Sequence, residues 1–134
     1  MNTLNDKVDH NKICNILDGN YELLVNYSEE LGRKYAPKNK SKKEKDSKLS
    51  SSQIRNILDS IQRMKKFDRN QLLRIRPKLA YAAGKALEEN SLRELQPILD
   101  KAIEETTSDK RFENFKEFLE AIVGYHRYYS VGKE

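Results

Sequence analysis

The sequence contains one cysteine and few glycines or prolines in 134 residues. A single cysteine excludes a disulfide within the chain and a Cys-x-x-Cys metal pair, which fits a reducing compartment. A chain of this length buries a sizeable core without such crosslinks. The simplest interpretation of Cys14 is therefore a small apolar filler of that core rather than a nucleophile.

Long apolar runs are also missing. No stretch approaches the roughly 20 apolar residues that a membrane-spanning helix needs. The opening residues, MNTLNDKVDH, contain neither the basic start nor the apolar centre of a secretory signal. We therefore expect a cytoplasmic protein that makes no contact with a membrane.

Signs of β-structure are missing as well, since no segment alternates apolar and polar residues and no Asn-Gly or Asp-Gly turn occurs. Apolar residues recur at helical spacing, which predicts an all-α protein. We expect an N-terminal helical segment over 1–35, broken near Gly19, a flexible basic linker over 36–50, and a core helical bundle over 51–134, within one domain overall. The linker has almost no apolar residues, so burial cannot offset the entropy of ordering it.

Helix starts are marked by side chains that accept backbone hydrogen bonds. Ser50, Asp68 and Ser91 each precede a Gln or Glu by three residues, the spacing of a capping box. Pro77 lies inside the helix expected after Asp68, where it either kinks that helix or starts a new one. Pro97 fits the first turn of the helix expected after Ser91.

The last expected helix begins near residue 107 or 108 and carries one broad apolar face. Its members are Phe112, Phe115, Leu119, Ile122, Val123 and His126. On such a face, His126 is better explained as a packing residue than as a base. No HExxH, GxSxG or phosphate-binding glycine loop is present. Many helical ribonucleases have an arginine four to six residues from a histidine, but no arginine stands at that distance before His126. We therefore predict a protein that is not an enzyme and needs no cofactor or metal.

The charge is distributed unevenly along the chain. The formal net charge is +5, but residues 55–85 carry nine basic and two acidic side chains, whereas residues 88–120 carry five basic and ten acidic ones. Residues 34–48 add seven lysines to this positive middle third. Such a concentration favours a polyanionic partner, with plain solvation as the alternative.

Part of this charge falls on one helix face. At 100° per residue, Arg74, Lys78, Tyr81 and Lys85 lie together, opposite the apolar stripe of their helix. Lysine and arginine neutralise phosphates, and a tyrosine ring stacks on a base or ribose, so the face suits RNA. An ordinary solvated face with an incidental tyrosine is the alternative. On the preceding helix, one flank and the back of the apolar stripe carry Arg55, Gln62, Arg63 and Lys66.

Gly84 follows a run of small residues in the same helix. A glycine in a helix interior costs about 1 kcal/mol against alanine, so we expect close helix packing here, within the domain or against a neighbouring subunit. A merely tolerated glycine is the alternative.

Three blocks of sequence together resemble one known family. They are KLSSSQIRNIL at 48–58, RIRPKLAYAAGK at 74–85 and FKEFLEAIVGYHRYY at 115–129. Their order and spacing are similar to those of the small helical subunit of the type III-A CRISPR effector, the Csm complex. The chain departs from the family's usual pattern at Gly124, where alanine is common, and at Val131, where a second glycine often precedes the Gly-Lys pair.

The resemblance implies a fold of about five bundled helices. It also implies a protein without nuclease activity. It implies repeated copies beside a backbone of RNase subunits, holding guide RNA and target RNA through phosphate and ribose. Carried over position by position, it makes RNA contacts of Lys48, Ser52, Arg55, Lys78, Lys85 and Arg127. The charge pattern and the C-terminal tract add Arg63, Arg74, Tyr81 and Lys133. A helical adaptor that binds only proteins is the first alternative, and a nuclease that uses His126 is the second.

Overall fold

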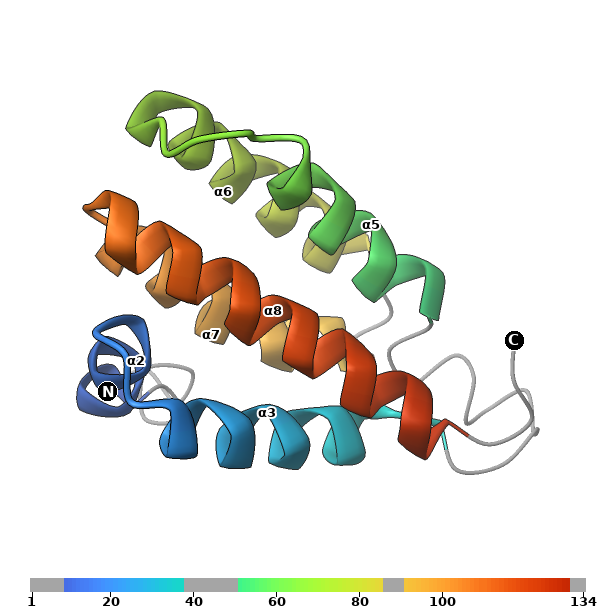
Figure 1. Cartoon of the computed structure of the whole chain (residues 1–134). Helices are drawn as coiled ribbons and strands as arrows, with labels where there is room; N and C mark the ends of the chain where they lie inside the picture. The colour runs from blue at the N-terminus through green and yellow to red at the C-terminus, as the bar shows by residue number, and fades with distance from the viewer. Residues whose placement is uncertain (1–8, 38–50, 86–90, 131–134) are drawn as a thin grey trace.

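The computed structural model describes residues 9–37, 51–85 and 91–130. Within these residues it contains helices and no strand, which confirms the expected all-α class (Figure 1). The six helices are α2 (His10–Leu17), α3 (Tyr21–Tyr35), α5 (Ser51–Gln62), α6 (Arg69–Lys85), α7 (Leu92–Glu105) and α8 (Asp109–Tyr129). None of these helices is long and apolar enough to span a membrane.

Helix α8 lies across the middle of the bundle. Helix α3 runs along one side of it, α5 and α6 lie on the other side, and α7 lies behind it (Figure 1). Its three phenylalanines, Phe112, Phe115 and Phe118, are at most 1% exposed and form the centre of the core. Every described helix contributes buried side chains to that same core, including the two helices of the N-terminal segment.

The helix ends are stabilised largely as the sequence predicts. Asp68 accepts hydrogen bonds at 3.2 Å from both the backbone N and the side-chain Nε2 of Gln71. Ser108 accepts one at 3.2 Å from the backbone N of Arg111, so the last helix begins where expected. Gly19 has φ of +108°, a conformation that glycine adopts at little cost, and it separates α2 from α3.

Other local expectations are wrong. The side chain of Ser91 makes no capping hydrogen bond, and its backbone is already helical. Helix α7 begins at Leu92, directly after Ser91 as expected, but this start places Pro97 in the second turn rather than the first. Pro77 lies inside α6, so no new helix starts there.

The start of the expected linker and the surroundings of the cysteine also differ from expectation. Ala36 and Pro37 are buried against the bundle, whereas residues 38–50, with Ser50, lie outside the described residues. Cys14 is half-buried but not among apolar atoms only, since its Sγ lies 3.7 Å from Glu105 Oε1. It is therefore not the purely apolar filler that the sequence suggested.

Close helix packing occurs at Gly32 rather than at Gly84. A Cβ on Gly32 would lie 2.6 Å from Tyr125 Cβ and 2.7 Å from the backbone N of His126, so α3 and α8 touch there. A Cβ on Gly84 would meet nothing within 4 Å, so the expected packing within the domain is wrong. Packing of Gly84 against a neighbouring subunit stays a prediction.

Candidate nucleic-acid interface

Two arginines of the positively charged segment 55–85 form contacts within the protein that stabilise the helix bundle. Arg69 donates to the backbone oxygens of Ile103 and Thr106 at 2.9 and 2.8 Å and to that of Glu104 at 3.0 Å, where α7 ends. The last carbonyl oxygens of a helix lack the usual amide donor four residues on. Ile103 O also accepts a backbone hydrogen bond from the N–H of Thr106 at 3.1 Å, and Arg69 donates to all three oxygens, so Arg69 caps the end of α7. Arg76 forms an ion pair with Asp100, and this hydrogen-bonded contact raises the pKa of its guanidinium.

The other seven basic side chains of this segment are exposed. They are Arg55, Arg63, Lys65, Lys66, Arg74, Lys78 and Lys85. Across the part of the chain that the structure describes, none of them lies in an ion pair with a carboxylate. The two acids of this segment, Asp59 and Asp68, are too few to offset them. Their charge is available to a polyanion.

A groove separates α5 from α6. It has a volume of about 450 Å³. It is lined by Gln53, Asn56, Ile57 and Ser60 of α5, by Ile75, Lys78, Leu79, Tyr81, Ala82 and Lys85 of α6, and by Leu92 of α7. Lys78, Tyr81 and Lys85, which helical spacing predicted on one face, thus border the same cavity. Its floor is apolar and its rim carries cations and side-chain amides.

Tyr81 is the exposed ring of this groove. Its side chain is 70% exposed, and Lys85 Nζ lies 5.4 Å from the centre of the ring. A ring held in this way presents a free face to a base or ribose, while the lysine remains beside it for a phosphate.

A smaller pocket of about 200 Å³ lies between α5 and α8. It is lined by Ser52, Ile54 and Arg55 of α5 and by Val123, His126 and Arg127 of α8. The pocket brings Arg127 of α8 next to Ser52 and Arg55 of α5, which lie far from it in the sequence. His126 is 1% exposed, which confirms its assignment as a packing residue.

The directions of the helices place both groups at one end of the bundle. Helix α5 starts there, and α6 and α8 end there (Figure 1). Ser52 and Arg55 lie in the first turns of α5, Lys85 ends α6, and Arg127 lies in the last turn of α8. Five predicted contacts, these four and Tyr81 one turn before Lys85, therefore lie towards one end of the bundle, and a sixth, Lys78, lies near the middle of α6.

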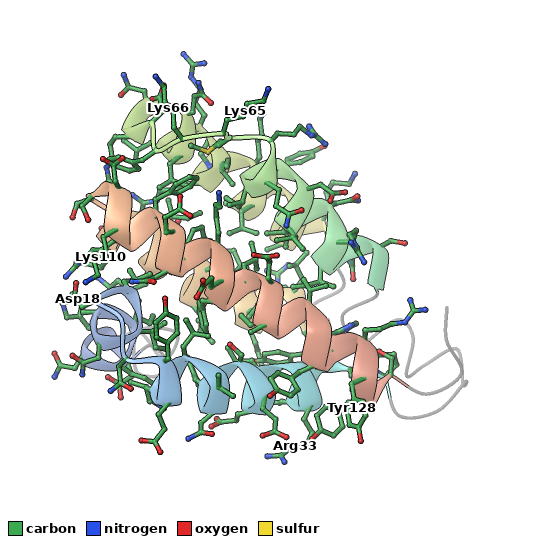
Figure 2. The ribbon with its side chains drawn as sticks, in the orientation of Figure 1. Asp18, Arg33, Lys65, Lys66, Lys110 and Tyr128 are labelled. Atoms are coloured by element: carbon green, nitrogen blue, oxygen red, sulfur yellow. The ribbon has the colours of Figure 1, made fainter. Side chains whose placement is uncertain are left out.

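Other predicted residues lie elsewhere. Arg63 was expected on the same helix as Arg55, but α5 ends at Gln62, so Arg63 lies beyond it, at the opposite end of the bundle, near Lys65 and Lys66 (Figure 2). Neither Lys65 nor Lys66 was among the predicted RNA contacts, although two adjacent lysines in a short interhelical connection were a usable signal. Arg74 is exposed one turn before Lys78 but does not line the groove. Lys48 and Lys133 lie outside the described residues.

The face formed by α2 and the start of α8 is organised differently. Arg111 donates to Asp18 Oδ1 at 2.8 Å and to Oδ2 at 3.0 Å, and to the backbone oxygen of Glu105 at 2.8 Å. The hydrogen bonds from Arg111 lower the pKa of Asp18. Arg111 and Asp18 on this face are therefore paired within the protein, unlike the seven exposed cations of segment 55–85.

Comparison with protein families identifies a relationship for most of the chain. The family model described as Csm2 Type III-A matches residues 18–132. No curated protein and no solved structure matches the chain. The matched range contains all the described predicted contacts and starts near the end of α2.

Proposed function

The chain belongs to the Csm2 Type III-A family, the small subunit of the type III-A CRISPR Csm complex, and we propose that in this complex it holds guide RNA and target RNA through their sugar–phosphate backbone. The groove between α5 and α6 is the observation that carries the proposal. Lys78 and Lys85 border it with Tyr81 between them, and none of the three is engaged by an acid among the described residues.

The chemistry of this surface favours binding without sequence preference. Lysine and arginine contacts to phosphate carry no sequence information, and stacking on Tyr81 accepts any base. A subunit that must accommodate any guide sequence needs this kind of contact. The pocket of Ser52, Arg55 and Arg127 extends the surface towards α8 with two further cations and a hydroxyl.

The subunit acts in this proposal without catalysis. A general base must come within hydrogen-bonding reach of the proton that it removes. His126 is buried and offers little surface for that role. RNA cleavage by the purified chain that disappears in His126→Ala would contradict this part of the proposal.

Tight binding to RNA requires the other subunits of the complex. Separate contacts of one copy to phosphate are weak at physiological salt, and several linked copies bind far more tightly. We therefore expect cytoplasmic assemblies that contain further copies of this chain and the RNase backbone subunit. The remaining predicted contacts of the same RNA are Lys48, Arg63, Arg74 and Lys133.

The alternative is a helical adaptor that binds only proteins. Binding of the purified chain to fluorescently labelled single-stranded RNA between about 50 and 200 mM salt separates the two. Our proposal predicts affinity that falls steeply with salt and does not depend on sequence. RNA binding that is absent both for the chain and for the assembled complex, or that does not change with salt, would favour the adaptor.

A further inference from the structure

Three side chains of different chemistry meet where α2 lies against the end of α7. His10 and Cys14 are four residues apart on α2, which places them on one face of that helix. Glu105 is the last residue of α7. The possible ligand atoms of the three residues all lie within 4.8 Å of one another.

The distances among them match those between ligands that share a metal ion. Cys14 Sγ lies 3.6 Å from His10 Nε2 and 3.7 Å from Glu105 Oε1. In a tetrahedral zinc site, bonds of about 2.3 Å to sulfur and about 2.0 Å to nitrogen or oxygen separate the ligand atoms by about 3.5 Å. Only small side-chain adjustments would therefore bring the thiolate, the imidazole and the carboxylate around one ion.

The donor types also suit zinc. A thiolate, an imidazole and a carboxylate are ligands that Zn²⁺ accepts, whereas Mg²⁺ and Ca²⁺ prefer oxygen alone. The side chain of His10 is 53% exposed and that of Glu105 is 24% exposed, so an ion can enter from solvent. Three protein ligands leave the fourth position to a water molecule.

One neighbouring charge opposes a cation here. Arg111 Nη1 lies 3.7 Å from Glu105 Oε1, although the same guanidinium also donates to Asp18 and to the backbone. This competition, with only three ligands, points to a site of moderate rather than extreme affinity. It also leaves Glu105 Oε2 facing His10, at 3.9 Å from Nδ1.

We propose that His10, Cys14 and Glu105 bind one zinc ion that clamps α2 to the end of α7. The site lies far from the groove of α5 and α6, on the opposite side of α8 (Figure 1). It does not depend on the proposed RNA-binding function. Binding would fasten the first described helix to the bundle, because the ligands come from helices remote in sequence.

Cobalt provides the direct test. The full chain, reduced and freed of metal with a chelator, is titrated with Co²⁺ while absorption from thiolate-to-cobalt charge transfer is recorded. Cys14 is the only cysteine of the chain, so this band reports on it alone. We expect one cobalt per chain, loss of the band when Zn²⁺ displaces it, and a higher unfolding temperature with Zn²⁺.

The variants His10→Gln and Glu105→Gln test the other two ligands. Each should weaken cobalt binding by at least about tenfold, since even an outer partner of a metal ligand contributes that much. The matched control is Glu120→Gln, which removes an exposed carboxylate of α8 that is not part of the proposed site, and it should bind cobalt as the wild type does. Far-ultraviolet circular dichroism verifies that each variant is folded. If Glu105→Gln does not fold, the cobalt affinity of His10→Gln alone tests the proposal.

Three outcomes would overturn the proposal. They are a titration without a charge-transfer band, wild-type affinity in a folded His10→Gln variant, and one cobalt for every two chains. The last would mean that the thiols of two copies bridge the ion.

Discussion

Arg76 of α6 and Asp100 of α7 face each other in a two-bond ion pair, with 2.8 Å from Nε to Oδ1 and 2.9 Å from Nη2 to Oδ2. Lys78 lies only two residues further along α6, yet its side chain is exposed and borders the groove. One positively charged segment therefore both joins two helices and offers charge to a partner. The two roles predict different effects of mutation.

Breaking the Arg76–Asp100 pair should reduce stability. Arg76→Ala and Asp100→Ala should each lower the free energy of unfolding by about 1 kcal/mol, since both side chains are partly exposed. The double variant should lose less than the sum of the two, because the interaction disappears only once. Urea denaturation followed by circular dichroism measures this coupling. Fully additive losses would mean that the pair contributes nothing.

Gly32→Ala should destabilise the fold. The added methyl would meet Tyr125 Cβ and the backbone of His126, so α3 must move away from α8, at a cost of about 1–3 kcal/mol. Gly84→Ala is the matched control in open space and should raise stability by up to about 1 kcal/mol through helix propensity. Equal thermal shifts for the two variants would contradict the close contact of α3 with α8.

These glycines show why the sequence predicted the helices better than their packing. Periodic apolar residues and capping residues such as Asp68 and Ser108 act locally, so their consequences can be deduced from spacing. The closeness of Gly32 to α8 depends on a crossing between distant helices. A local signal existed, because Ser28, Gly32 and Ala36 form a row of small residues at four-residue spacing, and all three are buried.

The candidate site was predictable to a similar extent. Lys78, Tyr81 and Lys85 lie on one helix, and their common face follows from 100° per residue. The convergence of Arg55 with Arg127 rests on the packing of α5 against α8, which no local pattern describes. Charge counting likewise could not separate Arg69, which caps α7, from the exposed cations around it.

The Asp18–Arg111 contact should give the protein acid-sensitive stability. Hydrogen bonds from Arg111 lower the pKa of Asp18 in the folded state. The contact therefore stabilises the fold above the unfolded-state pKa of about 3.9, and this contribution is lost as the pH falls through the lowered pKa. Asp18→Asn should be less stable than the wild type at pH 7, and the difference should shrink in acid. Urea denaturation over a pH series tests this, and a difference that does not change with pH would contradict it.

Tyr81 should contribute to RNA binding through its ring alone. Its side chain is exposed and packs against little of the core, so Tyr81→Ala should keep the stability of the fold. RNA binding should weaken by about 1–3 kcal/mol if one base stacks on the ring. Tyr81→Phe retains the ring and should bind nearly as the wild type does. Equal losses in both variants would assign the effect to the hydroxyl instead.

The most direct test of an RNA-binding surface on α5 and α6 is RNA affinity across a salt series for two charge-reversal variants. Lys78→Glu/Lys85→Glu changes the groove, whereas Arg33→Glu/Lys110→Glu changes the net charge equally at exposed positions away from α5 and α6 (Figure 2). Fluorescence anisotropy with single-stranded RNA should show at least about tenfold weaker binding for the groove variant. Its plot of log affinity against log salt should be shallower by about 1.4, from about 0.7 per lost phosphate contact, while the control variant stays close to the wild type. Equal losses in two folded variants would mean that only net charge matters, and this would contradict a binding surface on α5 and α6.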